Sequence, residues 1–282
     1  MEARSSVQIL EYTSDAGVAK SRRTVVSLLI LGVFAGAFIA FAAEGSNMAA
    51  FNLFANPETY GLGKVLAGTV FGTGLMLVLV AGGELFTGNT LILVSVLDKK
   101  VKIREMLRNW ALVYIGNFIG SIFIAYMMCK SGLLNSGNSV LGGQTIKIAA
   151  YKTGLPFLSA FYLGVMCNWL VCLAVWVSFA AKDVLGKLFA CFFVIGLFVT
   201  SGFEHSIANM YYIPAGIFAK ANEAWAETAR VSSEQLANLN WFSFVVKNLI
   251  PVTAGNIIGG SVMVGGLYWA ALKKKSAAAP TV

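Results

Sequence analysis

Charged side chains are scarce in this chain, which has 282 residues and only 12% Asp, Glu, Lys and Arg. Soluble domains carry about a quarter charged residues. Hydrophobic residues instead make up 57% of the chain. This balance excludes an ordinary soluble protein and predicts an all-α protein that crosses a membrane several times.

Histidine is scarcer still, since His205 is the only one in the chain. Without a second histidine, an H-E-x-x-H motif or a G-x-S-x-G motif, neither a zinc site nor a nucleophile pair can be assembled. The cysteines include no C-x-x-C pair and are interpreted as small buried hydrophobic residues. They are Cys129, Cys167, Cys172 and Cys191. We therefore expect no enzyme, no metal site and no cofactor.

The N-terminus lacks the basic region and short apolar core of a cleaved signal peptide, because Glu2, Glu11 and Asp15 precede the first apolar run. Residues 1–24 are expected to stay on the protein as an amphipathic segment at the membrane surface. Residues 25–272 are expected to form the transmembrane domain, and residues 273–282 a short tail.

Six apolar runs are long enough to cross a bilayer, which takes about 20 helical residues. They lie at 25–45, 64–97, 108–129, 157–181, 187–217 and 243–272. The second and fifth are too long for one straight span, because about 34 residues of helix would measure roughly 50 Å against a hydrocarbon core of about 30 Å. Both helices are predicted to break midway.

The two predicted breaks carry the same pattern, G-x-E-x-x-x-x-N. It begins at Gly82 in the second run and at Gly202 in the fifth. Irregular backbone at membrane depth is tolerated only where protein buries it or water reaches it. The pattern therefore predicts that both breaks lie at a cavity.

Other segments repeat in the same order along the chain. The matched pairs are Leu31-Gly32-Val33 with Leu163-Gly164-Val165, Asn109 with Asn248, and GNFIG at 116–120 with GNIIG at 255–259. These matches define two repeats, at about 25–129 and 157–272. Because each repeat has three spans, the second must enter the membrane upside down relative to the first, and the repeats are inverted.

Lysine and arginine gather on one side of the predicted membrane. The residues on that side are Arg4, Lys20, Arg22, Arg23, Lys99, Lys100, Lys102, Arg104, Arg108, Lys182, Lys187 and Lys273–Lys275. Cytoplasmic loops carry such an excess, so both termini are expected in the cytoplasm. The clusters flank apolar runs instead of following one soluble face, so the net charge of +8 indicates orientation and not nucleic-acid binding.

An ionisable pair, Glu204 and His205, lies inside the fifth apolar run. Such a pair is costly in a bilayer and indicates a substrate path. The near-neutral ordinary pKa of histidine would let His205 donate a hydrogen bond or a proton to a small anion. Thr87, at the matching break, offers a hydroxyl that either faces the same path or caps the following half-helix.

Glu84 and Glu204 occupy equivalent positions in the two breaks. We expect them to be structural acids that accept backbone N–H bonds around each break, because an unpaired carboxylate in the path would repel an anion. The N-termini of the half-helices would aim backbone N–H groups at the cavity and favour an anion over a cation.

Three further residues could each have one of two roles. Lys152 ends the segment 130–156, which contains no Asp or Glu, and is either a solvated loop lysine or an anion-attracting group at the outer mouth. Phe71 and Phe198 each precede a break and either pack in the core or narrow the pore into a hydrophobic constriction.

The sequence resembles the formate/nitrite transporter family in four stretches that span most of the chain. They are GGELFTGNT at 82–90, NWLVCLAVW at 168–176, SGFEHSIANM at 201–210 and NLIPVTAGNIIGG at 248–260. The resemblance implies an aquaporin-like fold of six helices, a homopentamer with one pore in each protomer, and a place in the cytoplasmic membrane.

The resemblance also implies roles for single residues. His205 and Thr87 flank the permeating anion, Asn168 hydrogen-bonds the histidine, and Lys152 draws the anion in from outside. The implied constrictions are Phe71 and Phe198 on the outer side and Leu75, Ala208 and Asn256 on the cytoplasmic side.

The substrate that the resemblance implies is a small monovalent anion of a weak acid, passed as the anion or as the protonated acid. Formate, nitrite, hydrosulfide and short carboxylates differ by a few atoms, and the long segment 218–242 favours formate. A pore for water or neutral solutes is the alternative, although the paired Asn-Pro-Ala turns of aquaporins are absent.

Overall fold

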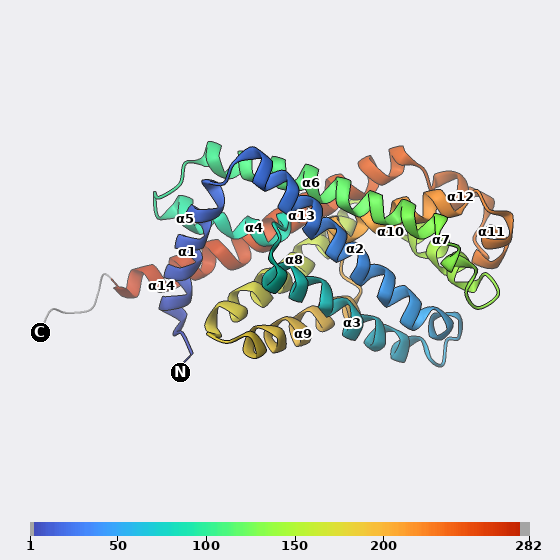
Figure 1. The fold of residues 1–282 in the computed structure, drawn as a ribbon, viewed down its shortest axis with the longest axis horizontal. Helices are drawn as coiled ribbons and strands as arrows, with labels where there is room; N and C mark the ends of the chain where they lie inside the picture. Colours follow the sequence, from blue (N-terminus) through green and yellow to red (C-terminus); the bar gives the residue numbers. More distant parts are fainter. Residues whose placement is uncertain (1–2, 277–282) are drawn as a thin grey trace, which may run out of the picture.

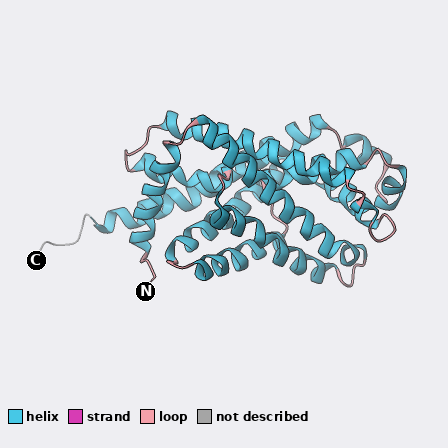
Figure 2. Ribbon diagram, in the orientation of Figure 1, coloured by secondary structure: helices cyan, strands magenta, loops and turns pink. Residues whose placement is uncertain are grey.

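The computed structural model describes residues 3–276, and every regular element in that range is helical (Figures 1 and 2). Six helical stretches in the described range are long and apolar enough to cross a membrane, as the sequence predicted. They are Val25–Ala55, Tyr60–Gly82, Ile103–Lys130, Phe157–Ala180, Val184–Ser201 and Ser243–Lys273. The expected tail therefore begins inside a helix, and residues 277–282 lie outside the described range.

Each half of the chain supplies three of these spans. The first half contains α1 (Ser6–Ser21), α2 (Val25–Ala55), α3 (Tyr60–Leu77), η1 (Val78–Gly82), α4 (Phe86–Asn89), η2 (Thr90–Ile92), α5 (Leu93–Leu97) and α6 (Ile103–Lys130). The second half contains η3 (Leu133–Asn135), α7 (Val140–Thr153), α8 (Phe157–Ala180), α9 (Val184–Ser201), α10 (Ser206–Ala219), α11 (Glu223–Ala229), α12 (Ser233–Asn238), η4 (Ser243–Leu249), α13 (Ile250–Ile257), η5 (Ile258–Gly266) and α14 (Leu267–Ser276).

Both predicted helix breaks are confirmed. Gly82 ends the first half of the broken second span with a φ of +94°, and Gly202 follows α9 with a φ of +81°. Left-handed backbone ends a helix, and glycine adopts it without the steric cost of a Cβ atom. The chain then runs through a short non-helical stretch before it resumes at α4 or α10.

The same close helix approach occurs in both halves. A Cβ atom on Gly120 would lie 2.1 Å from the carbonyl oxygen of Val33, and one on Gly259 would lie 2.2 Å from that of Val165. Small residues let helix backbones approach closely where lipid gives no hydrophobic drive for association. The structure thus supports the inverted three-span repeats that the sequence predicted.

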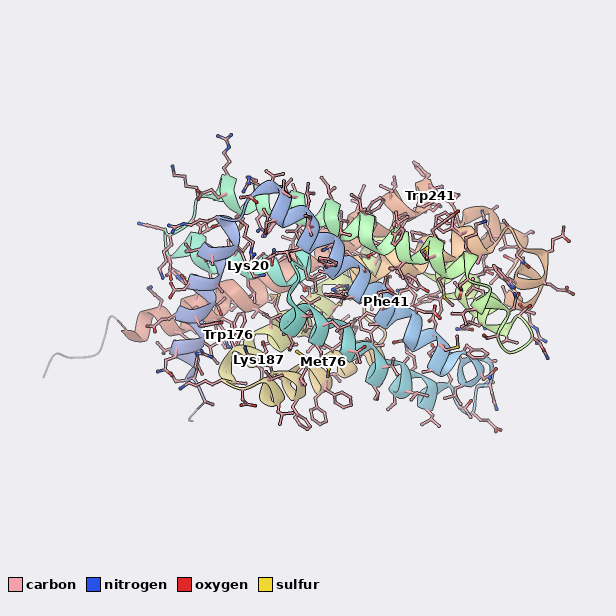
Figure 3. The ribbon with its side chains drawn as sticks, viewed as in Figure 1. Lys20, Phe41, Met76, Trp176, Lys187 and Trp241 are labelled. Carbon is pink, nitrogen blue, oxygen red and sulfur yellow. The ribbon has the colours of Figure 1, made fainter. Side chains whose placement is uncertain are left out.

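The exterior of the spans is apolar. Large hydrophobic side chains that are more than half exposed include Phe34, Phe41, Phe123, Phe189 and Phe193. Phe41 is labelled on α2 in Figure 3. A surface of this kind is stable in contact with lipid tails, which agrees with a multi-pass membrane protein.

Two segments expected to be loops contain helices. The stretch 130–156 forms α7, which buries Leu141, Ile146 and Ala149 against α10 and α11. The stretch 218–242 contains α11 and α12. Neither stretch has a 20-residue apolar run, because these helices are short: α7 and α11 each bury only part of their residues, and α12 buries none.

The N-terminal segment forms a helix that packs onto the rest of the protein. Helix α1 buries Ile9, Leu10 and Gly17 and packs against α5, η2 and α8. Figure 1 shows α1 and α14 at one end of the molecule and α7, α11 and α12 at the other. These are called the α1 end and the α7 end below.

Candidate functional site

The two broken helices meet at a direct contact between Thr87 and His205. The Thr87 hydroxyl oxygen lies 2.9 Å from His205 Nε2. Thr87 has no exposed surface, and His205 is only 3% exposed. The structure therefore brings together the two residues that the sequence placed on opposite sides of a path, and the Thr87 hydroxyl reaches His205 instead of capping a helix.

Backbone geometry fixes the tautomer of His205. The residue is the N-cap of α10, and its Nδ1 accepts a hydrogen bond from the backbone N–H of Ala208 at 3.0 Å. An accepting Nδ1 carries no hydrogen, so the imidazole proton lies on Nε2. The histidine can thus present one N–H donor toward Thr87.

The carbonyl of Thr87 is held by three side chains. Thr90 Oγ1 donates to it at 2.6 Å, Asn168 Nδ2 at 3.2 Å and Cys172 Sγ at 3.3 Å. Asn168 makes no hydrogen bond to His205, contrary to the prediction, because its amide is directed to this carbonyl, to Thr90 and to the Asn256 carbonyl. Asn168 and Cys172 therefore hold the Thr87 carbonyl in position.

A pair of aromatic rings lies next to His205. The ring centroids of Phe71 and Phe198 are 5.6 Å apart in an edge-to-face arrangement, and the Phe198 centroid lies 6.0 Å from that of His205. Both phenylalanines are almost fully buried. The predicted constriction residues Phe71 and Phe198 therefore do come together, and Phe198 lies next to the central histidine.

A cavity lies on each side of this centre. The α7-side cavity has a volume of about 260 Å³, and its lining includes Lys64, Lys152, Phe71 and His205. The α1-side cavity has a volume of about 420 Å³, and its lining includes Lys20, Arg23, Leu75 and Glu84. The centre thus separates two cavities that open toward opposite ends of the molecule.

Glu84 belongs to a polar cluster at the α1 end, which we call the α1-end cluster. Its carboxylate pairs with Lys20 Nζ at 2.9 Å and with Arg23 Nε at 3.1 Å. Asn89 Nδ2 donates to Glu84 Oε2 at 2.7 Å and to Asn109 Oδ1 at 2.8 Å. Figure 3 labels Lys20, which α1 supplies to this cluster.

Glu204 belongs to a matching α7-end cluster. Its carboxylate pairs with Lys152 Nζ at 2.7 Å, and Asn209 Nδ2 donates to Glu204 Oε2 at 2.6 Å and to Asn248 Oδ1 at 2.7 Å. Asn248 Nδ2 also donates to the Lys152 carbonyl, in the same way that Asn109 Nδ2 donates to the Lys20 carbonyl.

The two clusters show that α1 and α7 are counterparts. The second-last residue of each helix is a lysine, and the ammonium groups and carbonyls of these two lysines make equivalent contacts. The inverted repeat therefore begins before the first span of each half, with α1 and with α7. The repeats found in the sequence do not include α1 and α7, because these two short helices share few residues besides that lysine.

The helix breaks are held by asparagines, and not by the acids that were expected to accept backbone N–H bonds. Asn117 accepts from the Phe86 N–H and donates to the carbonyls of Gly32 and Glu84. Asn256 does the same for Ser206, Gly164 and Glu204. The carboxylates of Glu84 and Glu204 pair with lysines instead.

The three residues predicted near a cytoplasmic slit lie apart. Leu75 lines the α1-side cavity, whereas Ala208 lines the α7-side cavity in the turn that begins at His205. Asn256 lines neither cavity, because its amide is fully buried in the framework of the second break. The spacing of these residues along the chain does not reveal on which side of the centre each one lies.

Several site residues were not singled out from the sequence, chiefly Lys20, Arg23 and Lys64. The asparagines 89, 109, 117, 209 and 248 were noticed only as members of the repeat. The repeat was the available signal, because a polar residue kept at equivalent membrane depth in two halves has to satisfy equivalent backbone groups. Within residues 3–276, no group of three His, Cys, Asp or Glu residues could hold a metal ion.

Comparison with known proteins gives consistent matches. A family model described as "Formate/nitrite transporter" matches residues 7–270. The formate channel FocA of Haemophilus influenzae is 38% identical, with 93% of each chain covered. A probable formate transporter of Methanothermobacter thermautotrophicus is 37% identical, covering 94% of this chain and 96% of the relative. A solved pentameric formate channel with formate bound is 39% identical, with a TM-score of 0.78, covering 88% of this chain and 97% of that one.

Proposed function

The chain belongs to the formate/nitrite transporter family, and from this premise we propose that it is a membrane channel for small monovalent anions of weak acids, with formate as its main substrate. The observation that carries this proposal is the contact between Thr87 and His205 at the crossing of two broken helices, between two cavities. A hydroxyl and an N–H group that meet at one point offer two donors to a carboxylate of three heavy atoms.

In this proposal the anion replaces the contact between the two residues. His205 Nε2–H and the Thr87 hydroxyl each donate to one oxygen of the anion, while the Ala208 N–H keeps the imidazole oriented. The Thr87 hydroxyl is itself held in place because three donors fix the carbonyl of the same residue. Donors that are positioned in advance need little reorganisation when the anion arrives.

The aromatic constriction favours passage of the protonated acid over the anion, so the substrate has to take up a proton before it passes. A bare anion between the Phe71 and Phe198 rings loses its hydration without compensating hydrogen bonds, whereas the neutral acid loses much less. Since His205 Nδ1 already accepts the Ala208 N–H, the imidazole has no free position for a second proton. We infer that water in the α7-side cavity supplies the proton and that His205 remains a neutral donor.

Assembly and location follow from the relatives and from the charges. The solved relative is described as pentameric, and we propose a homopentamer with one path in each protomer. The lysine and arginine clusters lie toward the α1 end, which supports a cytoplasmic location for both termini in the cell's inner membrane. We further propose that the protein transports its substrate without chemical conversion beyond proton exchange.

The first experiment replaces His205 in purified protein reconstituted into liposomes. His205→Asn keeps a capping oxygen for α10 but no longer reaches Thr87. We expect formate flux to fall about tenfold or more, the consequence of losing one hydrogen bond to a charged group. Flux is measured at several pH values with formate, nitrite and hydrosulfide side by side, and vesicle shrinkage in an uncharged osmolyte reports water permeation.

Unchanged formate flux and unchanged pH dependence in His205→Asn would show that the central contact is not part of the path. Flux of nitrite or hydrosulfide well above that of formate would replace formate as the main substrate. Fast water permeation without anion flux in the wild-type protein would replace the anion channel with a neutral-solute pore.

A further inference from the structure

The α7-side cavity contains several charged groups that differ in how they are paired. Its lining includes Lys64, Lys147 and Lys152 as cations and Glu204 as a carboxylate. Lys152 was expected to attract the anion, yet its ammonium group lies 2.7 Å from Glu204 Oε1 and its side chain is only 11% exposed. A charge this close to an opposite charge contributes little net potential to the cavity.

Lys152 is also engaged by an aromatic face. Its Nζ lies 5.3 Å from the centroid of the Tyr212 ring, within the range of a cation–π contact. Its carbonyl accepts a hydrogen bond from Asn248, as the matching lysine does at the α1 end. Lys152 is therefore built into the framework of the second break.

Lys64 is placed differently. It lies on α3, is half-buried and lines the α7-side cavity. The five ion pairs among the described residues include none made by Lys64. A Cβ atom on Gly202 would lie 3.2 Å from Lys64 Nζ, so the ammonium group sits directly over the left-handed turn that precedes Glu204 and His205.

The base of the Lys64 side chain is anchored next to the same turn. The hydroxyl of Thr200, at the end of α9, donates to the Lys64 carbonyl at 3.4 Å. One helical turn further along α3, Ser46 on α2 donates to the Ala67 carbonyl at 2.9 Å. Lys64 thus projects an unpaired positive charge into the cavity from a backbone that two neighbouring helices hold in place.

A neutral donor accompanies this charge. Tyr212 lines the same cavity, and its hydroxyl makes no hydrogen bond to another described residue, whereas Tyr211 beside it donates to Glu44. A phenolic O–H can donate a hydrogen bond to a carboxylate while itself remaining uncharged. An ammonium group and a phenol that line the same cavity offer a small monocarboxylate one charge-assisted and one neutral donor.

We propose that Lys64, assisted by the Tyr212 hydroxyl, forms the binding station where a small monocarboxylate waits before the Phe71–Phe198 constriction, and that Lys152 positions Glu204 instead. The proposal rests on the proposed function, because it assigns the residues that select anions at the α7-side entrance. It predicts that affinity from that side depends on Lys64, while affinity from the α1 side does not.

The experiment measures formate flux in sealed membrane vesicles of known orientation, with formate added on one side at a time. Lys64→Met should raise the half-saturating formate concentration on the α7 side by about five- to tenfold, the loss expected for one half-buried charge–charge contact. The maximal flux should change much less, and Tyr212→Phe should give a smaller shift in the same direction. Lys64→Arg keeps the charge and should recover most of the affinity.

Two comparisons control for non-specific charge effects. Lys130→Met removes a lysine that lies over Tyr126 and is not among the residues lining the α7-side cavity. It should shift the half-saturating concentration by less than about twofold, as surface charges do in salt. The double variant Lys152→Met with Glu204→Gln removes a neutral pair and should shift that concentration less than Lys64→Met does.

The result that overturns the inference is an unchanged half-saturating concentration in a folded Lys64→Met protein, or an equal shift on both sides. A shift in the double variant as large as that of Lys64→Met would also overturn it and return the anion-attracting role to Lys152. Absence of anion flux in the wild-type vesicles is a separate outcome, because it rejects the proposed function before Lys64 is tested.

Discussion

His205 has two neighbours that require opposite properties from its ring. The Ala208 N–H requires an acceptor at Nδ1, and Thr87 receives whatever Nε2 then offers. A backbone donor cannot be reversed, so the ring cannot take the other tautomer without losing the cap of α10. In the proposed channel, the donor that His205 offers to the anion at Nε2 therefore depends on the hydrogen bond that Nδ1 accepts on the other side of the ring.

The Thr87 hydroxyl provides the matching test on the other broken helix. Thr87→Val keeps the shape of the side chain and leaves Nε2–H of His205 facing a methyl group. We expect formate flux in liposomes to fall about tenfold, because the anion loses one of its two donors. Thr87→Ser keeps a hydroxyl and should lose far less.

Equal flux losses in the valine and serine variants would mean that side-chain volume, and not the hydroxyl, matters at position 87. Thermal melting of each purified variant separates this result from general unfolding.

Single residues differed in how far the sequence could place them. His205 and Thr87 were predictable because the repeat puts both at equivalent breaks, and Phe71 and Phe198 because each precedes a break in its apolar run. The hydrogen bonds of Asn168 and the place of Asn256 were not predictable. An amide has donors and an acceptor, and its direction depends on backbone groups more than 80 residues away, such as Thr87 for Asn168 and Gly164 for Asn256.

At the scale of elements, the helix breaks are the features that create the path. Each exposes backbone groups at membrane depth, where an unpaired N–H or C=O group costs several kcal/mol. At the first break, Asn117 pairs with the Phe86 N–H and the Glu84 carbonyl and also with the Gly32 carbonyl on α2, and Asn256 makes the equivalent bonds at the second break. The break is therefore a stable structure and not a locally melted helix.

Removal of either asparagine should destabilise the protein to a similar degree. Asn117→Ala and Asn256→Ala each lose three hydrogen bonds to buried backbone groups, a loss of about 3 kcal/mol. We expect the melting temperature in detergent to fall by about 5–10 °C for each variant. The exposed Asn52 offers a control, since Asn52→Ala should change the melting temperature by only about 1 °C.

If Asn256 instead lined the path, Asn256→Ala would alter formate flux and leave the melting temperature near that of the wild-type protein. Differential scanning fluorimetry and flux measurements on the same preparation distinguish the two roles.

The spans were predictable from the length of the apolar runs, whereas α7 was not. A helix that packs one face against α10 needs only a few buried residues, and Leu141, Ile146 and Ala149 are too widely spaced to stand out as an apolar run. The equivalence of α7 to α1 follows only from the structure, in which Lys20 pairs with Glu84 and Lys152 pairs with the equivalent Glu204.

At the scale of the whole molecule, Asp98 connects α1 and α14 at the α1 end. Asp98, in the turn after α5, accepts hydrogen bonds from Ser14 on α1 at 2.7 Å and from Trp269 on α14 at 2.9 Å, and it pairs with Lys273 at 2.9 Å. Burial alone would raise the pKa of this carboxyl, but the bonds from Lys273, Trp269 and Ser14 outweigh it, and the pKa lies below its ordinary value of 3.8.

A lowered pKa means that the carboxylate stabilises the folded end at any pH above the ordinary value and loses this effect only as the pH falls through the lowered pKa. We therefore expect the attachment of α1 through Asp98 to be the same at pH 5 and pH 8. Asp98→Asn should increase tryptic cleavage after Lys20 about fivefold across that range, because charge-assisted bonds are about twice as strong as neutral ones.

Asp15 gives a control on α1 itself, since its ion pair with Lys100 is largely exposed. Asp15→Asn should leave the cleavage rate almost unchanged. A steep rise in cleavage of the wild-type protein between pH 8 and pH 5 would refute the assignment to Asp98.

The α1-end cluster and the α7-end cluster each draw their residues from one half of the chain, and this affects the order in which they can form during synthesis. All residues of the α1-end cluster precede α7 in the chain, and so does Asn117, which holds the first break. The first half can therefore close its break while the ribosome is still adding the second, which later closes its own around Glu204. The contact between Thr87 and His205 is one that neither half can form alone, so in the proposed channel the central site is complete only at the end of synthesis.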